Sequence, residues 1–172
     1  MNDDTERRRL RLARRAGLLR AYALLELVTD TERLMPEKIF GKRRRIIVPQ
    51  VKEPAAGMWS NCYVIGDLVV IAGMVGKDEN DQLVGPGDAY QQSLALFRRM
   101  RLFVEAAGGK MCDIIKLTAY LTDIRHRQAF IKARQEAFTG DFPPCVVVGG
   151  TVFAQPEYLV EVDAWAILGS GD

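Results

Sequence analysis

The sequence has a single histidine and only three cysteines, and this scarcity argues against several classes of site. His126 lies between two arginines, and no second histidine is present to complete a metal site or a Ser-His-Asp triad. The cysteines are odd in number and widely spaced, which is typical of free thiols in a reducing compartment: Cys62, Cys112 and Cys145. We therefore expect neither a disulfide framework nor a metal site.

Long apolar runs are also missing. No uninterrupted apolar segment approaches the ~20 residues that a membrane-spanning helix needs. The first residues lack the apolar segment of a secretory signal, so we expect a cytoplasmic protein with no membrane partner. Gly108-Gly109-Lys110 follows a predicted helix instead of opening one, so it is not read as a phosphate loop. We expect no cofactor.

The charge that is present is unevenly distributed along the 172 residues. Residues 1–50 carry 13 Lys/Arg against 7 Asp/Glu, whereas residues 51–172 carry 11 against 15. The sequence thus predicts a basic helical N-terminal extension, residues 1–45, attached to a mildly acidic domain, residues 46–172. Its arginines indicate either a solvated helix face that docks on this chain or on a neighbouring subunit, or an RNA contact. No aromatic side chain lies among the arginines to stack on bases, which favours the first interpretation.

Within the domain, apolar periodicity and turn residues predict the order of elements. Asp88 and Gly108-Gly109 supply the start and stop signals of the longer helix, and Asp123 can cap the second. The predicted elements are a strand at 46–48, a hairpin at 61–65 and 68–72, a helix at 89–107, a strand at 114–121, a helix at 126–138, and a closing pair of strands at 142–148 and 158–166.

This order predicts an α+β fold with one sheet and two helices on one face. The other face of the sheet would be left apolar, so we expect it to be buried against another subunit. In the last strand Val160, Val162 and Ala164 alternate with Glu161 and Asp163. Two acids on a strand that should be central need an explanation, because a buried charge needs a partner.

Five segments, in this order, resemble motifs of one family: VIGDLVVIAGM at 64–74, QLVG at 82–85, LFVEAAGG at 102–109, DIIKLTAYLTD at 113–123 and LVEVDA at 159–164. They are similar to the Rid family (reactive intermediate deaminases, also called YjgF-like proteins), whose members hydrolyse imines and enamines. The resemblance covers about residues 57–167. It implies a chorismate-mutase-like α+β subunit, a homotrimer, and clefts for small molecules between subunits.

The resemblance also implies site residues. Glu161 matches the family glutamate that positions or activates water, and it is the candidate catalytic residue. The candidate substrate-binding residues are Trp59, Gly73, Arg125 and Cys145. Cys145 stands where deaminating members have an arginine that grips the substrate carboxylate, so the chain is a divergent member by this criterion.

Each of these residues also has a structural interpretation. Glu161 can act as a general base, or be a structural acid bonded to backbone or to a neighbour's cation. Cys145 can be a nucleophile if a cation such as Arg125 acidifies it, or a small buried apolar side chain. Arg125 can supply the missing cation or be solvated, and Trp59 can wall the cleft or belong to the core.

The leading hypothesis is a Rid-like homotrimer that binds a small metabolite at subunit interfaces. If it is an enzyme, it is a hydrolase that deaminates an imine or enamine, with Glu161 positioning water. The alternative is a non-catalytic ligand-sensing or interaction protein. RNA binding or ribonuclease activity ranks third, because the sequence offers no residues dedicated to it.

Overall fold

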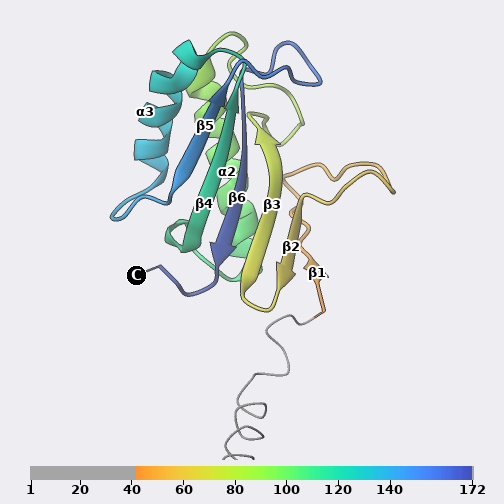
Figure 1. The fold of residues 1–172 in the computed structure, drawn as a ribbon. Helices are drawn as coiled ribbons and strands as arrows, with labels where there is room; N and C mark the ends of the chain where they lie inside the picture. The colour runs from red at the N-terminus through yellow and green to blue at the C-terminus, as the bar shows by residue number, and fades with distance from the viewer. Residues whose placement is uncertain (1–41, 172) are drawn as a thin grey trace, which may run out of the picture. The chain divides into compact units, whose positions relative to one another are not determined.

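The structure, a computed structural model, describes residues 42–171 (Figure 1). The basic helical extension expected at 1–45 lies outside these residues except for 42–45, of which Arg44 and Arg45 form a short strand and not a helix. The described part contains these strands and helices: β1 Arg44–Arg45, β2 Cys62–Ile65, β3 Leu68–Val75, α2 Ala89–Ala107, β4 Ile114–Leu121, α3 Arg127–Ala137, β5 Cys145–Gly149 and β6 Val160–Ile167. Two short 3-10 turns, Met111–Asp113 and Ile124–His126, precede β4 and α3. No helix within residues 42–171 is both long and apolar enough to cross a membrane.

The strands form one sheet in the order β1-β2-β3-β6-β4-β5. All neighbours are antiparallel except β4 and β5, which are parallel. The prediction that the last two strands pair with each other is therefore wrong, because β4 lies between β6 and β5. The reason is the helix α3, which carries the chain back along the sheet after β4, so that the next strand runs parallel to it.

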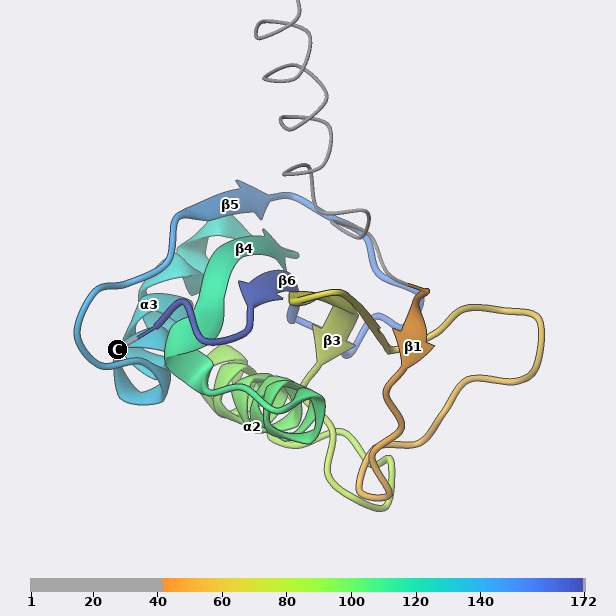
Figure 2. The same ribbon diagram turned by 90° about the horizontal axis from the view of Figure 1, so that it is seen from below.

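Both helices cover the same face of the sheet, as Figure 2 shows in the view from below. The core lies between them and the sheet, and it includes Leu96, Phe103 and Phe130 from the helices and Val160 and Val162 from β6. This confirms the predicted α+β fold with one sheet and two helices on one face. The opposite face exposes apolar side chains of β5 and β6: Val146, Val148, Trp165 and Ile167.

Local signals define the ends of α2 as the sequence predicts. The Asp88 side chain accepts hydrogen bonds from Tyr90 N at 2.9 Å and Gln91 N at 3.1 Å. At the other end Gly108 takes a left-handed conformation with φ of 103°, which a glycine adopts without strain. The second helix differs from its expected span, because Asp123 caps the 3-10 turn and the α-helix begins only at Arg127.

The strand expected at 46–48 is also wrong. Arg44 and Arg45 pair with β2, whereas Ile46 donates one hydrogen bond from its N–H to Cys62 O at 3.1 Å. Cys62 is the first residue of β2, so β2 has no further residue with which Ile47 and Val48 could pair. Ile46 and Val48 are nevertheless buried in the core, which explains their apolar character.

Candidate functional site

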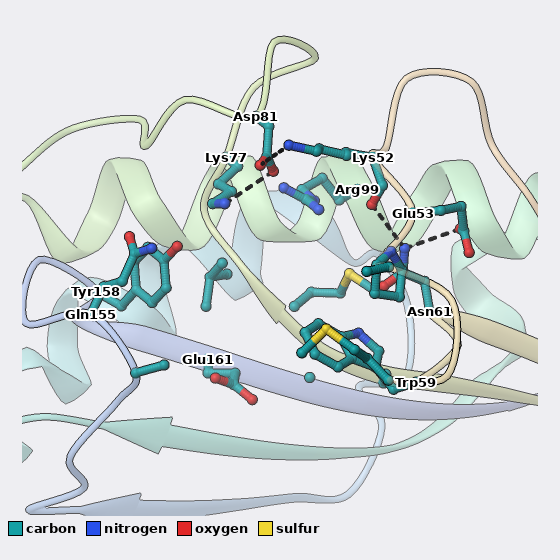
Figure 3. Close-up of a pocket in the computed structure, with 18 residues that line it drawn as sticks. Lys52, Glu53, Trp59, Asn61, Lys77, Asp81, Arg99, Gln155, Tyr158 and Glu161 are labelled. Carbon is teal, nitrogen blue, oxygen red and sulfur yellow. Dashed lines mark hydrogen bonds and ion pairs between the residues drawn. The ribbon is translucent and has the colours of Figure 1, made fainter.

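A cleft of about 730 Å³ opens at the edge of β3, past the point where β2 stops pairing with it (Figure 3). The last link between the two is a hydrogen bond from Ala72 N to Asn61 O at 2.9 Å. The β3 residues Gly73, Met74 and Val75 then line the cleft. The other walls come from the 52–61 loop, the 77–81 turn, α2, the 154–158 loop and β6.

The edge of β3 is bent at this point by a β-bulge. Ile71 lies opposite Ala164 and Met74 lies opposite Val162, so β3 has one more residue than β6 between these two pairs. A bulge re-aims the side chains around it and is common beside active sites. Here it places Gly73, an exposed residue, against the side chain of Glu161.

Glu161 lies so close to Gly73 that any larger residue at position 73 would displace its carboxylate. A Cβ built on Gly73 would overlap Glu161 Oε1 and lie 2.8 Å from its Cδ. The carboxylate is half-buried, and burial, followed by the nearby charge of Asp163, raises its pKa above the usual range. Within residues 42–171 it forms neither a hydrogen bond nor an ion pair. A half-buried acid with free oxygens and a raised pKa can accept and return a proton.

The opposite wall of the cleft is cationic. Asp81 binds Lys77 at 3.0 Å and Lys52 at 3.7 Å (Figure 3). Burial acts to lower the pKa of Lys77, but its hydrogen bonds with Asp81 and Tyr158 outweigh that effect and raise it. Arg99 enters this wall from α2. Its pKa is lowered chiefly by burial, with Asp81 and Tyr158 acting in the opposite direction.

Two buried amides hold the loops around the cleft. Asn61 donates from Nδ2 to Lys52 O at 3.2 Å and to Glu53 Oε1 at 3.1 Å. Gln92, on α2, donates from Nε2 to Glu157 O at 2.9 Å, and its Oε1 accepts from Leu159 N at 2.8 Å. The 154–158 loop is thereby tied to the long helix.

The structure brings together three of the five candidate residues. Trp59, Gly73 and Glu161 all line the cleft. Trp59 is 56% exposed and belongs to the cleft wall instead of the core. Arg125 does not line the cleft, and its largely exposed guanidinium is held by Asp123 at 2.5 Å.

Cys145 lies on the other face of the sheet. It sits opposite Leu117, which is fully buried under the helices, whereas Glu161 sits opposite Tyr120 and faces away from them. The cation beside the thiol is Arg134, not Arg125. Burial nevertheless raises the pKa of Cys145, and Arg134 only offsets part of this rise. This placement favours the small buried apolar side chain over the nucleophile.

The sequence interpretation missed the cationic wall. Arg99 follows Gln92 by seven residues and Leu96 by three, so it falls on the buried stripe of α2, where a cation is unusual. The position of Arg99 on this stripe is the signal in the sequence that could have indicated the cationic wall. Lys77 and Tyr158 lie in loops that no periodicity marks.

Among residues 42–171, no three His, Cys, Asp or Glu side chains cluster as a metal site would need.

Comparison with known proteins agrees with the fold and the motifs. A protein-family model described as Endoribonuclease L-PSP matches residues 50–168. The chain belongs to this family, the Rid or YjgF-like proteins. A 2-iminobutanoate/2-iminopropanoate deaminase from Dermatophagoides farinae is 29% identical to it over 109 residues, 62% of this chain and 83% of the relative.

Solved structures share the fold. A Pseudomonas aeruginosa protein of unknown function is 33% identical, with a TM-score of 0.67 over 75% of this chain and 94% of that one. A Rid-family protein of unknown function from Yersinia pestis is 20% identical, with a TM-score of 0.67 over 73% and 99%. The family and the α+β fold predicted from the sequence are therefore confirmed.

Proposed function

We propose that this Rid-family chain binds a small metabolite in the β3-edge cleft and hydrolyses an imine or enamine there. The observation that carries this is Glu161, a half-buried acid with a raised pKa and no hydrogen-bond donor within residues 42–171. A structural acid in a strand is normally satisfied by donors. Similarity to a deaminase supports the same reaction class.

In this reaction the imine reacts as its nitrogen-protonated form, which an enamine reaches by taking a proton on its β-carbon. Glu161 accepts a proton from water as the oxygen adds to the imine carbon, which gives a neutral carbinolamine. Glu161 returns this proton to the nitrogen, and as the C–N bond breaks the hydroxyl group gives up its own proton to the carboxylate or to solvent. Ammonia leaves and a carbonyl remains, so no oxidant, reductant or cofactor is consumed. Trp59 and Gly73 form the walls beside Glu161, and a general base of this kind contributes roughly 10²–10⁴-fold to the rate.

The proposal includes a homotrimer in the cytoplasm. Its support is the apolar face of the sheet that the helices leave uncovered, because patches of this kind mark subunit interfaces. Arg125 projects from the subunit surface, so it could reach a ligand only in a neighbouring subunit's cleft. All three cysteines are free thiols, which suits a reducing compartment.

The test is hydrolysis of 2-iminobutanoate, generated in the cuvette by an amino-acid oxidase and followed as 2-oxobutanoate appears. We expect the protein to accelerate the reaction over buffer, the Glu161→Gln variant to lose about 10²–10⁴-fold, and Glu105→Gln to keep full activity. Glu105 is a suitable control because it is an exposed acid on α2, outside the cleft. No acceleration by the wild-type chain would favour the non-catalytic ligand-binding protein instead.

A further inference from the structure

The cleft contains a cation that nothing in the proposed hydrolysis uses. Arg99 lines the cleft from α2, and its Nε atom is buried without a hydrogen-bond partner. It forms no ion pair with any residue in the described range, although the neighbouring Lys77 and Lys52 both bind Asp81. Leaving a buried guanidinium nitrogen without an acceptor is costly, so an unpaired Nε atom beside a cleft indicates a missing ligand group.

We propose that Arg99 binds a carboxylate of the substrate that is remote from the reacting carbon. This inference rests on the proposed site but adds a substrate class: small acids with a second, distal carboxylate. The planar guanidinium can grip a carboxylate with two parallel hydrogen bonds. Arg99 is thus the residue that determines specificity, while Glu161 acts at the other side of the cleft.

The arrangement of the walls places the two functions apart. Glu161 faces away from the helices, whereas Arg99 comes from a helix on the covered side of the sheet. The bulged edge of β3 lies between them, and both residues border the same cleft (Figure 3). Met58, Trp59 and Met74 line it as well, and they suit an apolar chain that joins the two polar ends.

The charges of this wall favour an anionic ligand group. Asp81 offsets one of the two lysines it binds, and Glu53 is engaged by Arg45 and Asn61. The guanidinium of Arg99 is left with no acceptor among the described residues. A ligand carboxylate would supply that acceptor.

The experiment compares binding of 2-oxoglutarate and 2-oxopentanoate, which have equal chain lengths and differ by the distal carboxylate. Binding is measured by calorimetry on the full chain, so it does not depend on turnover. We expect the wild-type protein to bind 2-oxoglutarate about tenfold or more tightly than 2-oxopentanoate. Arg99→Gln should abolish that preference, Arg99→Lys should keep part of it, and Arg98→Gln should keep all of it. Arg98 is the matched control because it is exposed on the same helix.

A second variant tests the same idea without altering Arg99. In Asp81→Asn the new asparagine tolerates the positive φ of 62° at this position. The substitution removes the carboxylate that Lys77 and Lys52 bind. We expect it to tighten 2-oxoglutarate binding several-fold and to leave 2-oxopentanoate unchanged. If the Arg99 variants do not fold, this variant decides whether the distal carboxylate binds at the cationic wall, and an unchanged affinity for 2-oxoglutarate would overturn the inference.

Equal wild-type affinities for the two acids, no binding of either, or a preference that survives in Arg99→Gln would overturn the inference. The outcomes also separate a failure of this inference from a failure of the proposed hydrolysis. Arg99-dependent binding of 2-oxoglutarate without acceleration of 2-iminobutanoate hydrolysis supports the anion site and removes the deaminase. If the wild-type chain accelerates hydrolysis and Arg99→Gln still prefers 2-oxoglutarate over 2-oxopentanoate, the deaminase is supported and the anion site at Arg99 is removed.

Discussion

At the scale of single residues, the acidity of Glu161 should set the pH dependence of activity. Burial and the Asp163 charge both raise its pKa, and a general base works only when it is ionised. Activity should therefore rise with pH through this raised pKa. Asp163→Asn removes the second cause and leaves the first, so the midpoint of kcat/KM against pH should move to lower pH. A midpoint that does not move would assign the titration to another group.

The same raised pKa has a consequence for stability. The neutral form of Glu161 is favoured in the folded state, so its contribution to stability is present at low pH and is lost as pH rises through the folded pKa. The Glu161→Gln variant used in the hydrolysis assay should therefore be no less stable at neutral pH than the wild type. Loss of activity without loss of stability is a common property of catalytic residues.

The close packing of Gly73 against Glu161 leads to a third prediction at the residue scale. Gly73→Ala places a Cβ where the Glu161 carboxylate lies, so it should displace that carboxylate, remove activity and cost some stability. In a Glu161→Ala background the obstacle is gone, and the same substitution should cost much less. Denaturant unfolding of the four proteins gives the coupling free energy between the two sites. Additive effects would mean that Gly73 serves the bulge itself and not the carboxylate.

At the scale of elements, Gln92 joins α2 to the loop that forms one end of the cleft. Gln92→Met leaves Glu157 O and Leu159 N without their partner, so we expect a loss of about 1–3 kcal/mol in the free energy of unfolding. Gln91→Met is the matched control, since Gln91 is exposed and should change stability by less than about 0.5 kcal/mol. Chemical denaturation measures both. An equal effect at both positions would contradict the proposed link.

The elements also show what the sequence can and cannot predict. The bounds of α2 follow from Asp88 and Gly108, which act within one turn of the chain, and the local pattern of the sequence predicts β4 to the residue. The parallel pairing of β5 with β4 depends on where α3 docks, which no local pattern contains. The site divides in the same way. Glu161 and Gly73 could be found from motifs, whereas the cleft around Arg99 forms only when a helix, a turn and two loops meet.

At the scale of the whole molecule, the uncovered face of the sheet should be the trimer interface. Trp165 is 45% exposed there, with Lys116 Nζ 5.3 Å from its ring centroid. Trp165→Glu places a charge in the expected contact, so light scattering should show a shift from trimer to monomer. Val152→Glu is the control, because Val152 is 93% exposed in a loop outside the sheet. A wild-type chain that is monomeric at micromolar concentration, or a Trp165→Glu variant that stays trimeric, would place the interface elsewhere.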